Sequence, residues 1–306
     1  MRIGLGLEMN GTIDDVVARA AALRSTGVAS LWSSQIFGWD TVTALAVVGR
    51  EVPEVALGTA VVPVHPRHPT MLAAQALTVQ AATGGRFMLG IGLSHKVVVE
   101  GIWGFSYEHP ARYMEEYLAI LVPMLAGEQV SFQGEFLRAS TLGPPETEGA
   151  TPPPVLVAAL GTVMLGVAAR QASGTVTWMV GPETLDRHIV PTITAAADRA
   201  GRPAPMVVVT LPVCVTDDPE TARHRAERIF SVYGHLPSYR SMLDREGVEG
   251  PADVAIVGDE GKVTAAIGRL ADAGATEFSA AAYGSPEELQ RTHALLGNLA
   301  RVGGNG

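Results

Sequence analysis

Two short segments bring together side chains that could perform nucleophilic or acid–base chemistry. Ser94 and His95 are adjacent in the sequence, so their side chains need not face each other as a nucleophile and its base must. His65 and His68 flank Pro66-Arg67 without a carboxylate or a third histidine, which argues against a metal site. No two carboxylates follow neighbouring apolar runs, which disfavours glycoside hydrolysis. The histidines are therefore expected either to donate a proton or to be ordinary loop residues.

A glycine-containing turn, Leu160-Gly161-Thr162, could bind a phosphate. It follows an apolar run at 155–159 and begins a helical pattern. Glycine lets a ligand approach the backbone closely, and free N–H groups at a helix N-terminus attract anions. The plainer interpretation is a tight turn in which Thr162 caps the helix. A second glycine pair, in Gly90-Ile91-Gly92, lacks the third glycine of a dinucleotide fingerprint and favours close strand–helix packing instead.

Eight short apolar runs alternate with longer helical patterns, and these elements must position the reactive residues. The predicted strands are Ile3–Leu7, Ala29–Ser33, Val55–Val62, Arg86–Gly92, Val155–Ala159, Thr175–Val180, Met206–Val215 and Glu277–Ala281. Strands that alternate with helices indicate a parallel sheet, and eight repeats favour a closed (β/α)8 TIM barrel over an open doubly wound sheet. We expect one domain over residues 1–306, with insertions at about 93–111, 128–153 and 234–258. The second insertion contains a predicted hairpin at 130–137 that turns at Gln133-Gly134.

The fold class selects the active site, because the carboxyl ends of barrel strands carry the chemistry in this architecture. The candidate residues at or after the ends of the predicted strands are Glu8, Asn10, Trp32, Ser34, Gln35, Val61, Val62, Pro63, His65, Ser94, His95, Gly161, Thr162, Trp178, Met179, Gly181, Tyr283 and Gly284. This set is polar but contains no acid–base pair of carboxylates.

Composition and charge limit the partners of the chain. Of the 306 residues, 47% are hydrophobic and 17% are charged, and the net charge is −9. A negative chain without a Lys/Arg cluster is not expected to bind nucleic acid. The charged fraction lies below the usual figure of about 25%, which favours a homodimer or a higher homo-oligomer. The single cysteine, Cys214, is predicted to be a buried thiol in a reducing compartment.

The N-terminal residues and the longest uncharged stretch bear on location. Residues 1–8 lack the apolar core of a signal peptide, and the uncharged stretch 151–169 contains three prolines and two glycines. A membrane span needs about 20 consecutive apolar residues. The sequence therefore predicts a cytoplasmic protein with no membrane segment.

Several segments resemble the bacterial luciferase-like monooxygenase superfamily, and the resemblance covers nearly the whole chain. They are Leu57-Gly58-Thr59-Ala60-Val61, Arg67-His68-Pro69 and Gly84-Gly85-Arg86-Phe87-Met88-Leu89-Gly90-Ile91-Gly92-Leu93-Ser94-His95. Further segments are similar to the actinobacterial branch that uses coenzyme F420, namely Trp103-Gly104-Phe105-Ser106-Tyr107, Tyr113-Met114-Glu115-Glu116-Tyr117-Leu118, Ala158-Ala159-Leu160-Gly161-Thr162 and Ala273-Gly274-Ala275-Thr276-Glu277-Phe278.

The resemblance implies a cofactor site as well as a fold. A deazaflavin (F420) or a flavin (FMN) would lie across the strand ends of an often dimeric barrel. Ala60-Val61, with Val62 beside it, matches a bulge with a non-proline cis peptide that supports the ring. The residues that would hold the phosphate are Leu160, Gly161, Thr162, Thr177 and Gly181, and those that would line the ring or its side chain are Ser34, Ser94 and His95.

One departure from the superfamily bears on the reaction. Its deazaflavin sugar-phosphate dehydrogenases carry an Asp-His pair after strand two, where this chain has Ser34-Gln35. Glutamine cannot accept a proton as a general base at neutral pH. We therefore expect hydride transfer between C5 of the deazaflavin and a C=C or C=N acceptor. Gln35 would orient the reactants, and a proton would come from His95, His65 or water.

The substrate pocket is predicted to contain Glu8, Trp32, Trp39 and Trp103, although core packing explains each tryptophan equally well. No metal is expected. Two alternative functions stay open, an FMN-dependent monooxygenase that uses oxygen and a non-catalytic ligand-binding barrel.

Overall fold

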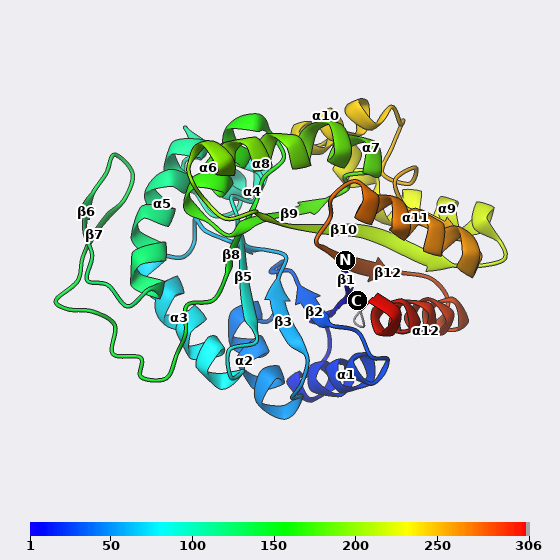
Figure 1. Ribbon diagram of the computed structural model, residues 1–306, viewed down its shortest axis with the longest axis horizontal. Helices are drawn as coiled ribbons and strands as arrows, with labels where there is room; N and C mark the ends of the chain where they lie inside the picture. The colour runs from blue at the N-terminus through cyan, green and yellow to red at the C-terminus, as the bar shows by residue number, and fades with distance from the viewer. Residues whose placement is uncertain (304–306) are drawn as a thin grey trace.

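The computed structural model describes residues 1–303, and its eight parallel strands close into the expected barrel (Figure 1). The strands in order around the barrel are β1 (Arg2–Gly6), β2 (Ser30–Ser33), β3 (Ala56–Thr59), β5 (Phe87–Gly92), β8 (Val155–Ala158), β9 (Gly174–Trp178), β10 (Met206–Val215) and β12 (Glu277–Ala282). Pairing of β9 with β10, and of β12 with β1, completes the ring. The prediction of a (β/α)8 TIM barrel is confirmed.

Helices cover the outside of this ring. They are α1 (Ile13–Ser25), α2 (Thr41–Glu51), α3 (Pro69–Ala82), α5 (Pro110–Leu125), α6 (Thr162–Gln171), α8 (Val190–Arg199), α9 (Pro219–Phe230), α11 (Glu260–Asp272) and α12 (Pro286–Gly303). A short α7 (Pro182–Thr184) and a π-turn at Leu185–Ile189 lead into α8. Acidic and hydroxyl caps begin several helices, as expected: Thr12 and Asp15 form a capping box, and Asp40 accepts from the Thr43 N–H at 2.8 Å.

Helix α4 (Lys96–Gly101) in the first insertion and β11 (Ile256–Gly258) in the last are elements that the sequence does not predict. The last insertion also contains α10 (Pro237–Glu246), where short helices that cover the barrel are expected. The predicted hairpin is wrong in its second strand, because β6 (Ser131–Gln133) pairs with β7 (Arg138–Ser140) across a longer turn. Figure 1 shows this hairpin standing away from the barrel beside α5.

One carboxylate fastens the turn of that hairpin to α5. Glu116 is 3% exposed and accepts from the N–H groups of Glu135 at 2.9 Å, Phe136 at 2.8 Å and Leu137 at 3.0 Å. Arg112 donates to the same side chain at 3.2 Å. Burial alone would raise the pKa of Glu116, but these hydrogen bonds hold the pKa below its ordinary value.

An apolar layer closes the barrel beneath its mouth. It contains Trp32, Met88, Leu156, Val176 and Val208, which point inward from five strands. The indole N–H of Trp32 donates to Glu277 Oε1 at 2.7 Å, near the amino ends of the strands. Any side chain at Gly58 would collide with the Trp32 ring, because a Cβ there would lie 2.4 Å from it. The barrel interior is therefore a packed core at this level.

The single cysteine lies on β10, as predicted. Cys214 is completely buried and packs with Ala222 of α9 and with Tyr283. Burial, with a smaller contribution from the Glu288 carboxylate, raises the pKa of this thiol to about 11.

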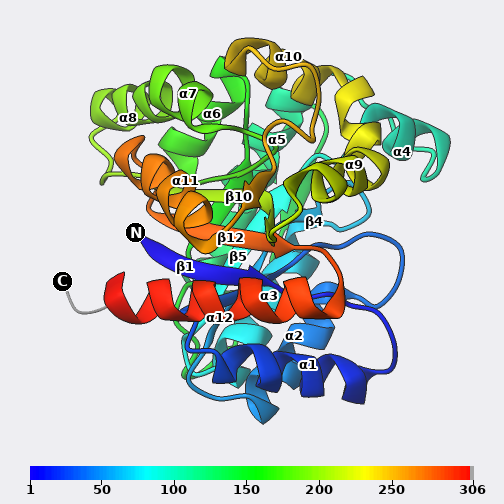
Figure 2. The same ribbon diagram turned by 90° about the vertical axis from the view of Figure 1, so that its right-hand side faces the viewer.

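Figure 2 shows the orientation of the mouth. The strand arrows point to the right of that view, where α4 and α9 lie at the rim, and β1 runs alongside α12. Within residues 1–303, no helix is long and apolar enough to cross a membrane.

Candidate functional site

A backbone bulge between β3 and β4 (Val62–Pro63) forms one wall of the mouth. The Ala60–Val61 peptide bond is cis, at the position that the resemblance implies. Neighbouring glycines make room for the bulge: a Cβ at Gly90 would lie 1.9 Å from the Thr59 carbonyl oxygen, and one at Gly92 would lie 2.8 Å from the Val61 side chain. The glycine pair of β5 thus serves strand–strand packing against the bulge, in place of the expected strand–helix packing.

Hydrogen bonds from the loop after β2 fix the outer edge of the bulge. Ser34 Oγ donates to the Ala60 carbonyl, and the Gln35 N–H donates to the Val61 carbonyl at 3.0 Å. Ala60 and Val61 themselves are only half-buried. They present a small apolar platform to the mouth.

The Gln35 side chain is held by its own loop. Its Oε1 accepts from the Thr41 N–H at 2.7 Å and from Arg67 at 3.4 Å, and its Nε2 donates to the Trp39 carbonyl at 3.2 Å. Arg67 also forms an ion pair with Asp40. The amide of Gln35 therefore stabilises the loop that carries Trp39, whose indole N–H donates to the Gly11 carbonyl at 2.8 Å.

Both candidate histidines lie at the mouth, on different sides. His65 is 7% exposed and stacks on Tyr113, with ring centroids 4.6 Å apart, and on Tyr107 at 5.7 Å. His95 packs edge-on against Tyr239 at 5.7 Å. Burial lowers the pKa of each ring, so both imidazoles are neutral at pH 7. A neutral imidazole can still donate one hydrogen bond.

Aromatic side chains from the first and last insertions cover the mouth, and the predicted site residues do not include Tyr107, Tyr233 or Tyr239. Tyr239 of α10 contacts Tyr233 at 5.3 Å, and Tyr233 contacts Trp178 at 5.5 Å. Tyr107 Oη donates to the Ser94 carbonyl at 3.3 Å. The sequence places aromatic residues in the predicted insertions. It does not show that they lie together, because the insertions meet only in the closed barrel.

The two helix N-termini expected to bind phosphate differ in their surroundings. Gly161 is the N-cap of α6 and receives no side-chain cap, and a Cβ added to it would meet nothing within 4 Å. At α7, by contrast, the N–H groups of Glu183 and Thr184 already donate to the Glu246 carboxylate, at 3.2 and 2.8 Å. Glu246 also fills the space in front of Gly181, so α6 offers the open anion site.

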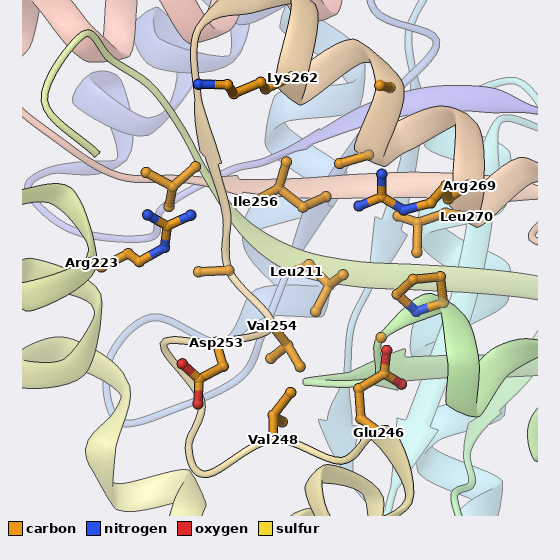
Figure 3. A pocket seen from close by; sticks show the side chains of 16 residues that line it. Leu211, Arg223, Glu246, Val248, Asp253, Val254, Ile256, Lys262, Arg269 and Leu270 are labelled. Atoms are coloured by element: carbon orange, nitrogen blue, oxygen red, sulfur yellow. The ribbon is translucent and has the colours of Figure 1, made fainter. Parts of the chain in front are cut away.

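A separate cavity lies outside the barrel wall (Figure 3). It has a volume of about 460 Å³ and lies between β10, β11 and α11, with Glu246 and Asp253 on one side and Arg223, Lys262 and Arg269 around the others. Leu211 lines it and follows Thr210 on β10, so the cavity and the barrel mouth lie on opposite faces of that strand. Gly181 is the one predicted site residue in its lining.

The remaining predicted residues are spread between core and rim. Trp32 is 2% exposed and belongs to the apolar layer, so core packing describes it. Trp39 is 45% exposed, and Glu8 at the end of β1 is exposed and accepts from Asn10 at 3.0 Å. Trp103 follows α4 and is half-buried, whereas Thr177 is buried with an unpartnered hydroxyl among the residues that the structure describes.

Two hydroxyl groups that the sequence motifs do not select lie just above the apolar layer. Thr210 and Ser279 are register partners on the adjacent strands β10 and β12. Across residues 1–303, neither Thr210 Oγ1 nor Ser279 Oγ has a hydrogen-bond partner, although both atoms are buried. Strand alternation in the sequence could have identified both residues. Each is a polar residue at an inward position of an otherwise apolar strand, Thr210 two residues after Val208 and Ser279 two residues after Glu277.

Comparison with known families identifies this arrangement. Residues 1–298 match the profile of the luciferase-like monooxygenase family. The chain belongs to this family. Its relatives include an uncharacterized protein of Mycobacterium tuberculosis that is 28% identical over 258 residues, covering 79% of this chain and 76% of the relative. Another is the F420-dependent hydroxymycolic acid dehydrogenase of the same organism, 27% identical over 239 residues, covering 72% of this chain and 59% of the relative.

Solved structures of other proteins share the fold. The coenzyme F420-dependent tetrahydromethanopterin reductase from Methanopyrus kandleri superposes with a TM-score of 0.81 at 19% identity, covering 97% of each chain. The oxygenating constituent of 3,6-diketocamphane monooxygenase from Pseudomonas putida, a complex with FMN, superposes with a TM-score of 0.75 at 17% identity, covering 98% of this chain and 97% of the other. In the described part of this luciferase-like chain, no three His, Cys, Asp or Glu side chains gather to hold a metal ion.

Proposed function

We propose that the chain is a coenzyme F420-dependent oxidoreductase that transfers a hydride between the deazaflavin and a small organic substrate. The observation that carries the proposal is the half-buried Ala60–Val61 platform, which faces the mouth of a barrel that also offers an open helix N-terminus. The F420-dependent relatives favour the deazaflavin over FMN.

The residues of the mouth fit a planar ring with a phosphate on its side chain. Ala60 and Val61 give an apolar surface for one face of the ring, and Ser34 and Gln35 hold the carbonyl groups of the bulge in place. The uncapped N–H groups at Gly161 and Thr162 would hold the phosphate. When bound, the deazaflavin supplies or accepts the hydride at C5.

The protein's own part in the reaction is to position the reactants and to exclude water. Tyr107, Tyr233 and Tyr239 cover the mouth, and burial raises the pKa of each phenol, so all three stay protonated at pH 7. The neutral ring of His65 or His95 would donate a hydrogen bond, and proton transfer would follow from water. This arrangement suits reduction of a C=C or C=N acceptor, which needs no strong general base.

Equilibrium binding tests the cofactor assignment. Purified protein is titrated with F420 and, separately, with FMN, and binding is followed by absorbance and fluorescence of each ring. We expect saturable binding of F420 that is tighter than that of FMN. Saturable binding of FMN alone would instead support the monooxygenase alternative, which the FMN-containing structural neighbour favours. If neither compound binds, the proposal is wrong, and the ligand-binding barrel is left.

A substitution at Gly161 tests the phosphate site separately from folding. The φ of Gly161 is −82° and no atom crowds its Cβ position, so the backbone accepts a side chain. Gly161→Asp places a carboxylate at the α6 N-terminus, which stabilises the helix by about 0.5–1 kcal/mol but repels a phosphate. We expect cofactor binding to weaken at least tenfold while the melting temperature does not fall. Gly161→Asn is the matched neutral control and should weaken binding much less.

A further inference from the structure

The hydroxyl groups of Thr210 and Ser279 form a pair that has no hydrogen-bond partner in the described part of the chain. Thr210 and Ser279 are direct register partners on parallel strands, whose axes lie about 4.8 Å apart. Two side chains at that spacing can both contact one atom placed between them. Ser279 is 1% exposed and its Oγ has no partner within residues 1–303, which also holds for Thr210 Oγ1.

A buried hydroxyl without a partner loses its hydrogen bonds to water on folding, so the folded chain bears an energetic cost at these two positions. Valine and alanine would fill the same space without that cost. Such local conflicts with packing rules are expected where a residue serves a ligand.

The pair lies where a substrate would meet the cofactor. In the closed strand order, β10 is four strands from β3, so Thr210 faces the Ala60–Val61 bulge across the barrel. Both hydroxyl-bearing residues stand two positions beyond the row formed by Val208 and Glu277, immediately above the apolar layer. A ring supported by the bulge would leave this opposite wall to the second reactant.

The chemistry of the wall selects a neutral oxygen. Strands β9, β10 and β12 contain no lysine, arginine or histidine, so they provide no counter-charge for a carboxylate or phosphate. Two hydroxyl donors aimed at one point instead match a carbonyl oxygen, and they become stronger partners as that oxygen gains negative charge.

We infer that Thr210 and Ser279 bind the carbonyl oxygen of an α,β-unsaturated ketone or aldehyde and stabilise the enolate formed on its reduction; this inference rests on the proposed function. A hydride from the reduced deazaflavin would add to the β-carbon. The electron pair of the C=C bond would then form a new double bond between the α-carbon and the carbonyl carbon, and the π pair of the C=O bond would move to the carbonyl oxygen. The two hydroxyl groups donate to that oxygen, and a proton from water then adds to the α-carbon.

The first test needs no ligand. Thr210→Val and Ser279→Ala remove unpaired hydroxyl groups, so the melting temperature of the ligand-free protein should stay the same or rise. The matched control is Thr175→Val on the outward face of β9, where Thr175 Oγ1 donates to the Val157 carbonyl at 2.8 Å. That control should lower the melting temperature. A fall for Thr210→Val and Ser279→Ala equal to that of the control would assign them a structural role and overturn the inference.

The second test uses 2-cyclohexen-1-one as the probe, with protein saturated by oxidised F420 so that no turnover occurs. Each single variant should bind the probe about tenfold more weakly, the expected loss for one hydrogen bond of about 1.4 kcal/mol. The carbonyl stretching band of the bound probe should move to higher wavenumber in the double variant, and Thr175→Val should leave affinity and band unchanged. Absence of saturable probe binding to the wild-type protein, or unchanged affinity in both variants, would overturn the inference. Failure of F420 itself to bind would instead count against the proposed function, and the melting-temperature test would still be decisive for the pair.

Discussion

At the scale of single residues, strand parity decides which predicted side chains reach the mouth. Trp32 is predicted to line the site because it lies near the end of β2. In the structure it points inward one layer below the mouth, where it packs over Gly58. Ser34, two residues later, does reach the bulge. The sequence predicts the inward face of β2 but not the height at which the core ends, because that height depends on how the strands stagger around the barrel.

Partners of buried polar groups are equally hidden from the sequence. Gln35 is predicted to orient the reactants, but the structure shows its amide bonded to Thr41, Arg67 and Trp39 within the loops at this side of the mouth. Its direct role towards a ligand stays a prediction. In the sequence, Gln35 precedes Trp39 by four residues and Thr41 by six. That spacing allows its amide either to bond to the loop or to contact a ligand, and only the path of the loop decides between the two.

The buried ring of His65 should make stability depend on pH. Burial lowers its pKa below 6.5 in the folded protein, so the unfolded chain binds the proton first as pH falls. Stability is therefore complete above pH 6.5 and is lost as the pH falls from there through the folded pKa. In His65→Asn this loss is absent, and we expect a shallower decline in the free energy of unfolding between pH 7 and pH 5.

Urea denaturation at several pH values measures that decline. A His65→Asn slope equal to that of the wild-type protein would contradict the prediction. Partial burial also lowers the pKa values of the half-buried rings of His95 and His293, so some dependence on pH should persist in the variant.

At the scale of elements, long apolar runs are predictable and short ones are not. Seven of the eight barrel strands lie within about two residues of their expected bounds, because strands covered on both faces need continuous apolar sequence. The eighth region, Val55–Val62, is expected as one strand, and the bulge at Ala60–Val61 divides it into β3 and β4. The three-residue β11 and the six-residue α4 carry too little pattern to detect.

The hairpin β6–β7 depends on one carboxylate of α5, and this contact gives a stability prediction. Glu116→Gln keeps the size of the side chain but removes the charge that three N–H groups and Arg112 contact. Hydrogen bonds to a charged group contribute about 1.5–3 kcal/mol. We expect the free energy of unfolding to fall by about 2 kcal/mol near pH 7, within that range.

The effect should also depend on pH. The pKa of Glu116 is lowered in the folded state, so its stabilisation is present above the ordinary value of 4.5 and disappears as pH falls through the lowered pKa. Guanidinium denaturation at pH 7 and pH 3 measures both limits. Glu115→Gln, which removes the half-exposed partner of Arg170, is the control and should cost less than about 1 kcal/mol. Equal losses for the two variants would exclude the special role of Glu116.

At the scale of the whole molecule, closure of the barrel is what makes a site. The last insertion lies more than 120 residues after the first, yet their tyrosines, Tyr239 and Tyr107, both lie over the mouth. The sequence predicts the insertions and the strand ends separately. It does not show that aromatic residues from distant insertions meet, because that depends on the order of the strands around the ring.

The number of subunits in solution is a second property of the whole molecule. The low charged fraction predicts a homodimer, and exposed apolar side chains such as Val47 on α2 and Met71 on α3 are compatible with a subunit contact. Light scattering coupled to size-exclusion chromatography should give twice the chain mass of 32.0 kDa. A mass of 32.0 kDa at micromolar concentration would refute the prediction. Val47→Asp combined with Met71→Asp should yield monomers if these helices form the contact, and unchanged mass would place it elsewhere.

The buried thiol on β10 makes the protein convenient for labelling. Because Cys214 is sealed in the core and its pKa is about 11, maleimide and iodoacetamide reagents, which need an accessible thiolate, should leave the folded protein unmodified. A cysteine introduced at an exposed rim position such as Phe37 would then be the sole reactive group. A fluorophore attached there would report ligand entry in the otherwise native chain, without any need to remove the natural cysteine first.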